Sequence, residues 1–297
     1  MDFKFKKRYG QNFITDTNLL RAIVRDAGVT ANDHVIEVGA GAGALTRELA
    51  CAAASVTAFE IDRELEPILT ENLKDLPNVR VIYEDILEVR SEELETYKVV
   101  SNLPYYITTP VIFKFLECGR PPVKPFIGLP GLRIANLGEA RSNAARINAS
   151  ILATPPPVSM TLMVQREVAD RLAARPKTPE YGALTVSVQA RCSVTFKRAV
   201  PRAVFKPAPD VDSAVVRLDT LERAVPANFS ALVRAAFSMR RKTLVNNLMA
   251  GFGMSREQAC EALAELGKGA AVRAEELSPE EFIALAQCEM WNVECGI

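Results

Sequence analysis

The chain has 297 residues, of which 48% are apolar and 24% are charged, and its formal net charge is zero. These values predict a soluble globular protein of one large domain or two domains. No apolar run approaches the ~20 residues of a membrane span, and the basic N-terminus lacks the apolar region of a secretory signal. The single histidine, His34, argues against histidine triads and histidine-rich metal sites. The six scattered cysteines favour a reducing, cytoplasmic compartment.

The charges are distributed unevenly along the chain. Residues 186–246 contain eleven basic and four acidic side chains, whereas residues 247–297 contain three basic and nine acidic ones. The N-terminal arm is also basic. A segregated basic stretch favours binding of a polyanion, although the charges could equally mix on the folded surface.

The first predicted elements are a helix and a strand. Apolar residues recur at helical spacing over residues 16–28, and Gly28 ends the pattern. A strand over residues 35–38 then runs into a glycine turn, which is followed by a predicted helix over residues 44–53. Strand, glycine turn and helix are the opening of a nucleotide-binding α/β unit.

Gly39, Gly41 and Gly43 form this turn. Glycines permit positive φ and let backbone N–H groups approach a ligand at a helix N-terminus. No Lys-Ser/Thr pair follows them, which argues against a phosphate-binding P-loop. A turn that serves only tight packing remains an alternative.

Two further strands are predicted to end in acidic residues. The strand over residues 55–61 carries Glu60 nineteen positions after Gly41, where a carboxylate can accept both hydroxyls of a ribose. The strand over residues 79–83 leads to Asp85 and Ile86, which could bind the amine and the face of an adenine. The carboxyl ends of parallel strands share one edge of a sheet, so we expect these groups to converge.

The fourth predicted strand, residues 98–101, leads to Asn102-Leu103-Pro104-Tyr105. Pro104 cannot donate to a sheet, so the chain turns there. Asn102 offers hydrogen bonds to the edge of a planar base and Tyr105 offers a flat face. The alternative is an ordinary strand and proline turn with Tyr105 half-buried.

Later segments predict helices over residues 165–174 and 182–191 and strands over residues 194–200 and 214–218. Ser255 and Ser278 each begin a capping box that opens a helix. A boundary near residue 220 is expected to separate a catalytic α/β domain, residues 1–220, from a helical domain, residues 221–297.

The motifs together resemble those of the ribosomal RNA adenine dimethyltransferases. They are Gly10-Gln-Asn-Phe13, Glu37-Val-Gly-Ala-Gly-Ala-Gly43, Glu60-Ile-Asp62, Glu84-Asp85, Asn102-Leu-Pro-Tyr105, the segment from Val204 to Val216 and the segment from Phe237 to Leu244. The resemblance implies a seven-stranded Rossmann-like sheet with a small C-terminal helical domain. It further implies S-adenosylmethionine-dependent N6-dimethylation of two adjacent adenines in small-subunit ribosomal RNA, with a role in subunit maturation.

The resemblance also implies site residues. The side-chain oxygen of Asn102 and the carbonyl of Leu103 would accept from the adenine amine beside Pro104, with Tyr105 and Phe205 on the faces of the base. Predicted cofactor-binding residues are Gln11, Asn12, Ile14 (where leucine is usual), Gly39, Gly41, Glu60, Ile61, Asp85, Ile86 and Asn102. Predicted RNA-binding residues are Lys6, Lys7, Arg8, Arg234, Arg240, Arg241 and Lys242, each of which could instead be an ordinary solvated cation.

One segment interrupts the resemblance. Residues 118–157 are longer and less regular than the short loop expected there, and we predict a partly ordered surface insertion. The expected protein is a monomer without a metal site. Alternatives are a methyltransferase acting on another adenine-containing nucleic acid, and a nucleic-acid-binding assembly or transcription factor without catalysis.

Overall fold

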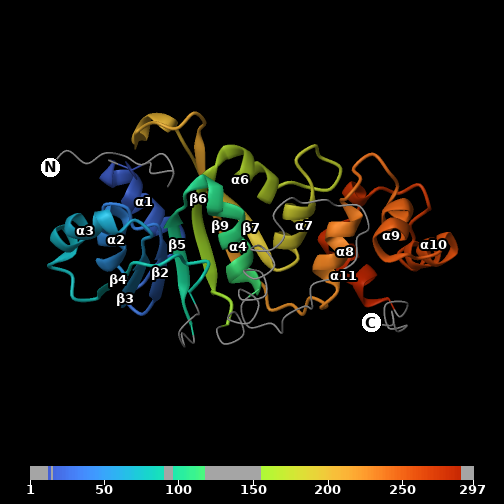
Figure 1. Ribbon diagram of the computed structural model, residues 1–297, viewed down its shortest axis with the longest axis horizontal. Coiled ribbons are helices and arrows are strands. Elements are labelled where there is room, and N and C mark those ends of the chain that lie inside the picture. Colours follow the sequence, from blue (N-terminus) through green and yellow to red (C-terminus); the bar gives the residue numbers. More distant parts are fainter. Residues whose placement is uncertain (1–12, 15, 90–95, 118–154, 289–297) are drawn as a thin grey trace. The chain divides into compact units, whose positions relative to one another are not determined.

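The computed structural model describes residues 13–14, 16–89, 96–117 and 155–288 (Figure 1). They form two compact units. The first takes the described residues up to 117 together with 155–169 and 193–220, and the second takes 170–192 and 221–288. Residues 170–192, expected in the first domain, therefore cluster with the C-terminal helices, and a domain boundary at residue 220 stays a prediction.

The first unit contains a seven-stranded sheet with the strand order β4-β3-β2-β5-β6-β9-β7 (Figure 1). The strands are β2 (His34–Val38), β3 (Ser55–Phe59), β4 (Val79–Ile82), β5 (Lys98–Asn102), β6 (Ser159–Gln165), β7 (Cys192–Val200) and β9 (Ser213–Thr220). The strands from β4 to β6 pair in parallel, whereas β9 runs antiparallel to β6. This mostly parallel sheet confirms the expected Rossmann-like class.

A second, two-stranded sheet joins distant parts of this unit. Strand β1 (Phe13–Ile14) pairs antiparallel with β8 (Phe205–Lys206), so that Ile14 faces Phe205 in the register. The segment that opens the described chain is thereby attached to a segment that follows most of the large sheet in the sequence.

Buried apolar strands form the middle of the large sheet. In β5, Val99 and Val100 are fully buried, and in β6 every residue except the last is buried. Continuous apolar runs of this kind are typical of strands covered on both faces. Helix α1 (Thr17–Ala27) contributes Ile23 and Ala27 to the core cluster that contains Val100.

The ends of α1 match their sequence signals. The Asp16 side chain caps the helix by accepting the N–H groups of Asn18 and Leu19, and Gly28 ends it with φ 59°. This is the expected pairing of an acidic N-cap with a left-handed glycine C-cap. The other helices of the unit are α2 (Ala44–Ala50), α3 (Glu66–Leu73), α4 (Thr108–Glu117) and the start of α6 (Arg166–Leu172). Short 3₁₀ turns are η2 (Arg63–Leu65), η3 (Tyr105–Ile107) and η5 (Arg202–Val204).

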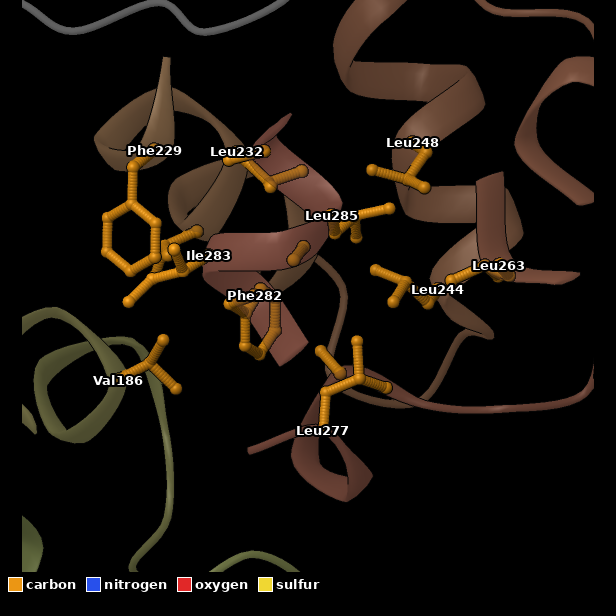
Figure 2. Packing of buried hydrophobic residues seen from close by; sticks show 14 of the residues in the cluster. Val186, Phe229, Leu232, Leu244, Leu248, Leu263, Leu277, Phe282, Ile283 and Leu285 are labelled. Atoms are coloured by element: carbon orange, nitrogen blue, oxygen red, sulfur yellow. The ribbon is translucent and has the colours of Figure 1, made fainter. Parts of the chain in front are cut away.

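The second unit is helical. It contains α7 (Ala183–Gln189), α8 (Phe229–Ala236), α9 (Leu244–Phe252), α10 (Arg256–Glu265), the 3₁₀ turn η6 (Ala274–Glu276) and α11 (Pro279–Gln287). Figure 2 shows its apolar core, in which Phe229, Leu248 and Phe282 are fully buried. Ser255 and Ser278 form the predicted capping boxes of α10 and α11. The expected helical C-terminal unit is confirmed.

Two predicted features fall largely or wholly outside the described residues. Residues 118–154 of the predicted insertion are among them, and so is the basic N-terminal arm up to Asn12. Among the described residues, no helix is long and apolar enough to cross a membrane. In the same residues no cluster of candidate metal ligands is found.

Candidate active site

A cavity of about 180 Å³ lies at the carboxyl edge of the large sheet. Its walls come from the segments that follow β2, β3, β4 and β5, and from Phe13 and Ile14 of β1. The strand order reverses direction between β2 and β5, because β3 and β4 lie on one side and β6 on the other. Ligands of open α/β sheets bind in the crevice at such a switch point, outside the carboxyl ends of the strands.

The two strands at the switch point separate before they end. Their paired register covers Val35 with Lys98 and Ile36 with Val99. Beyond it, the N–H of Val38 donates to the side-chain oxygen of Ser101 at 2.9 Å, and both the bond and Ser101 are buried. The Ser101 hydroxyl thus accepts the Val38 N–H in place of a backbone carbonyl of β5. The N–H group has a hydrogen-bond partner although the backbone pairing of the two strands has already ended.

The glycine turn after β2 has a left-handed backbone, and at Gly41 it also packs closely against Phe13. Gly39 has φ 80°, and a Cβ there would lie 3.4 Å from Cδ of Pro104. Gly41 has φ 58°, and a Cβ there would lie 2.7 Å from Cε1 of Phe13. The left-handed backbone favours glycine at both positions, and the contact with Phe13 favours it further at Gly41.

Glu60 is held rigidly at the end of β3. One carboxylate oxygen accepts the N–H of Gly41 at 2.8 Å, and the other accepts the N–H of Asp62 at 2.9 Å. The side chain is only 6% exposed, and burial raises its pKa against the opposing effect of these bonds. The backbone of Ile61 also hydrogen-bonds to this carboxylate, and the acceptor capacity that remains can serve a ligand.

Glu37 is a site residue that the predicted list omitted, although it stands in the glycine motif. It lies within β2, lines the cavity, and is 1% exposed. Burial, with a smaller contribution from the charge of Glu60, raises its pKa to about 8. An acidic residue inside an otherwise apolar strand is the sequence signal that could have identified it.

The segment after β4 supplies Glu84, Asp85 and Ile86 to the cavity. One oxygen of Asp85 accepts the N–H of Leu87 at 2.9 Å, which fixes the orientation of the carboxylate. Ile86 is buried at 5% exposure, whereas Ile61, on the segment after β3, is 43% exposed. A buried aliphatic side chain and an oriented carboxylate are a suitable pair for a flat ring with an exocyclic amine.

Asn102 and the three residues after it form the wall contributed by β5. The N–H of Leu103 donates to the carbonyl of Met163 at 3.3 Å, which continues the pairing of β5 with β6 past Asn102. The hydroxyl of Tyr105 lies 2.7 Å from that of Ser213, and burial raises the Tyr105 pKa. The turn at Pro104 therefore presents Asn102, Leu103 and Tyr105 to one cavity, as the sequence predicts.

Ile14 and Phe205 pack in the same core cluster, but only Ile14 also lines the cavity. Ile14 lines the cavity and is 6% exposed. Phe205 is 3% exposed, packs in the core cluster and is not among the cavity-lining residues. The structure thus brings Tyr105 to the cavity but not Phe205, and a role for Phe205 against a base stays a prediction.

The remaining predicted residues are elsewhere. Lys6, Lys7, Arg8, Gln11 and Asn12 lie outside the described residues. Four predicted RNA-binding cations, Arg234, Arg240, Arg241 and Lys242, are exposed on α8 and the turn after it, in the helical unit.

Comparison with known proteins identifies the family. The family model for ribosomal RNA adenine dimethylase matches residues 2–288. The chain belongs to this family. It is 41% identical to "Ribosomal RNA small subunit methyltransferase A" of Streptococcus pneumoniae and 42% identical to that of Bacillus mycoides, over 96% of this chain and 91% of each relative.

Solved structures of other methyltransferases share the fold of this chain. A dimethyladenosine transferase from Plasmodium falciparum superposes with a TM-score of 0.70 at 23% identity, covering 92% of this chain and 95% of that one. The 23S rRNA methyltransferase ErmE superposes with a TM-score of 0.65 at 27% identity, covering 93% and 98%. The protein is therefore an S-adenosylmethionine-dependent methyltransferase with the Rossmann-like fold of its family.

Proposed function

We propose that this enzyme dimethylates the N6 amines of two adjacent adenines in small-subunit ribosomal RNA and thereby takes part in subunit maturation. The observation that supports this most directly is the convergence of Glu60, Asp85, Asn102 and Tyr105 on one cavity at the switch point. The relatives at 41–42% identity are named for the same subunit.

The cavity residues fit S-adenosylmethionine. Glu60 would accept from the ribose hydroxyls with the acceptor capacity that its backbone bonds leave, and Asp85 beside Ile86 suits the adenine ring. The turn of Gly39 and Gly41 keeps side chains away from the amino-acid portion. When bound, the cofactor supplies an electrophilic methyl group attached to sulfur.

The target amine is activated by hydrogen-bond acceptors rather than by a strong base. Its lone pair is delocalised into the adenine ring, so it is a poor nucleophile. The side-chain oxygen of Asn102 and the carbonyl of Leu103 would each accept one N–H, which localises the lone pair and orients it for attack. Tyr105 would stack on the base, with its hydroxyl fixed by Ser213. Catalysis by positioning and electrostatics requires no histidine.

The RNA would be held largely by phosphate contacts outside the cavity. The exposed cations Arg234, Arg240, Arg241 and Lys242 support this role, and we assign the same role to Lys6, Lys7 and Arg8. Such contacts release counterions, so affinity should fall steeply with salt. The target base must leave its helix to reach the cavity. We further propose that the enzyme acts as a monomer in the cytoplasm.

Transfer of labelled methyl groups to purified ribosomal subunits tests the proposal. Small subunits lacking the modification should be labelled at two neighbouring adenines, identified by mapping the modified bases. Large subunits serve as the control, because the structurally similar ErmE is named for 23S rRNA. Labelling confined to large subunits, or equal labelling of free adenosine, would contradict the proposed substrate.

A further inference from the structure

Phe196 is an unusual surface residue. It lies on β7, the last strand in the order of the large sheet (Figure 1), and its side chain is 39% exposed. Exposed edge strands usually carry charged rather than aromatic residues, because an apolar edge favours aggregation. The guanidinium carbon of Arg166 lies 5.0 Å from the centroid of the Phe196 ring, within cation–π range. We call this exposed pair the Phe196–Arg166 shelf.

The shelf is attached to the active site through the start of β9. The N–H of Arg166 donates to the carbonyl of Asp212 at 3.0 Å. The next residue, Ser213, holds the hydroxyl of Tyr105 at 2.7 Å. Asp212 and Ser213 are consecutive, so the backbone that positions Arg166 also positions the ring proposed to stack on the target base. The residue before them, Val211, is 43% exposed.

The sequence around Phe196 is basic. Residues 192–209 contain Lys197, Arg198, Arg202 and Lys206 and no acidic residue. Arg198 is paired with Asp26, and Lys197 follows Phe196 directly, so it points to the opposite face of the strand, whereas Arg202 and Lys206 are exposed. The carboxylate of Asp212 accepts the N–H of Arg202 at 2.9 Å. An aromatic ring flanked by cations is the combination that binds single-stranded nucleic acid, with bases on the ring and phosphates on the cations.

We propose that the Phe196–Arg166 shelf binds the nucleotide adjacent, along the RNA strand, to the adenine that enters the cavity. The Phe196 ring stacks on the base of that nucleotide, and the Arg166 guanidinium contacts its phosphate. This inference rests on the proposed function, and it assigns a binding role to two residues outside the cavity. The enzyme thus binds two consecutive nucleotides, one against Tyr105 and one against Phe196.

Substitutions at the shelf give the first test. Phe196→Ala and Arg166→Gln should each lower kcat/KM on small subunits roughly tenfold, mainly through KM, since stacking on an aromatic residue contributes about that much per base. Phe196→Trp should retain wild-type values. Cofactor affinity measured by calorimetry should not change in any variant, because none of these residues lines the cavity.

Two matched controls come from the same unit. Val158→Ala removes an apolar side chain that is 48% exposed at the amino end of β6, away from the cavity edge. Lys197→Gln removes a charge from the strand of Phe196, but successive strand residues point to opposite faces. Both controls should stay near wild-type. Equal losses in Lys197→Gln and Arg166→Gln would overturn the shelf as a specific site.

A coupling experiment then identifies what the shelf binds. Small subunits are reconstituted with ligated RNA in which the nucleotide before or after the target adenine is abasic. With one of these particles, the abasic change alone and Phe196→Ala alone should each lower kcat/KM roughly tenfold. The two changes together should also lower kcat/KM only roughly tenfold, because both remove the same contact. Independent, multiplicative losses with both particles would overturn the inference. Failure of the wild-type enzyme to modify intact particles would instead count against the proposed function, so the two failures are distinguishable.

Discussion

The carboxyl edge of the large sheet and the core of the helical unit differ in the kind of side chain that they bury. Among the described residues, the buried carboxylates are Glu37, Glu60 and Asp62, and all three lie in or just after β2 and β3. The helical core is built from fully buried apolar side chains such as Phe229, Leu248 and Phe282 (Figure 2).

This difference predicts which property a substitution will affect in each region. Burying a carboxyl group costs free energy unless hydrogen bonds compensate for the lost hydration. The carboxylates that line the cavity therefore lower the stability of the sheet edge. The helical core gains from burial and has no such cost. Substitutions in the core should therefore affect unfolding, whereas those at the sheet edge should affect turnover and ligand affinity.

The largest expected effect on stability is in the helical core. Phe282→Ala removes a ring that is fully buried and lies 5.8 Å, centroid to centroid, from the ring of Phe237. Truncation should lower the free energy of unfolding by about 3–5 kcal/mol, measured by urea denaturation. Phe282→Leu is the control and should lose less. A loss below about 1 kcal/mol for the alanine variant would show that this core is not well packed.

The largest expected effect on turnover is at Asn102. Asn102→Ala should reduce single-turnover methyl transfer roughly a hundred- to a thousandfold at saturating cofactor and RNA, because one preorganised acceptor is lost. RNA affinity should change little, since phosphate contacts lie elsewhere. Asn102→Asp retains an acceptor and should keep partial activity. A near-normal rate in Asn102→Ala, together with an inactive Tyr105→Ala, would show that stacking alone holds the base.

Glu60 should control cofactor affinity. Glu60→Ala removes hydrogen bonds to a charged group, each contributing about 1.5–3 kcal/mol, and calorimetry on the folded variant should show weaker binding. Glu60→Gln, which keeps the size of the side chain, is the control for damage to the glycine turn. Burial raises the pKa of Glu60, so this carboxylate gains a proton at a higher pH than an exposed one does. As the pH is lowered, the cofactor affinity should therefore begin to fall earlier than it would with an exposed carboxylate. Unchanged affinity in Glu60→Ala would remove Glu60 from the site.

The expected effect at Glu37 is a dependence of stability on pH. Its pKa is about 8 in the folded protein and near 4.5 when exposed, so the folded state binds one more proton between these values. Stability of the cofactor-free protein should fall with rising pH across this window by about 1.4 kcal/mol per pH unit. Glu37→Gln should remove that slope and be more stable than wild-type at pH 8. An unchanged slope would show that Glu37 is not the group responsible.

The sequence predicted best what depends on local chemistry. Asp16, Gly28, Ser255 and Ser278 mark helix ends because their side chains or backbone freedom satisfy nearby groups. The convergence of Glu60, Asp85 and Asn102 was also predictable, because parallel strands place their carboxyl ends on one edge.

The deviations have tertiary causes. The predicted strand 55–61 ends at Phe59, since Glu60 turns to accept from Gly41 and Asp62. The predicted helix from residue 165 begins at Arg166, because Gln165 remains paired with Ser213 in the sheet. The predicted helix 44–53 ends at Ala50, where the chain turns so that Ala54 can donate to Asp33. The burial of Phe205 depends on β1, which no local pattern in residues 200–210 reveals.

The pairing of β1 with β8 has a consequence for synthesis of the chain. Phe13 and Ile14 form one wall of the cavity, yet their strand partners are Lys206 and Phe205. Domains fold as the chain emerges from the ribosome, N-terminal part first. A nascent chain that has exposed β2 to β5 already carries the four strand ends that line the cavity but lacks the partner strand of this wall. The cavity is therefore completed late in translation, after the segment containing β8 has emerged.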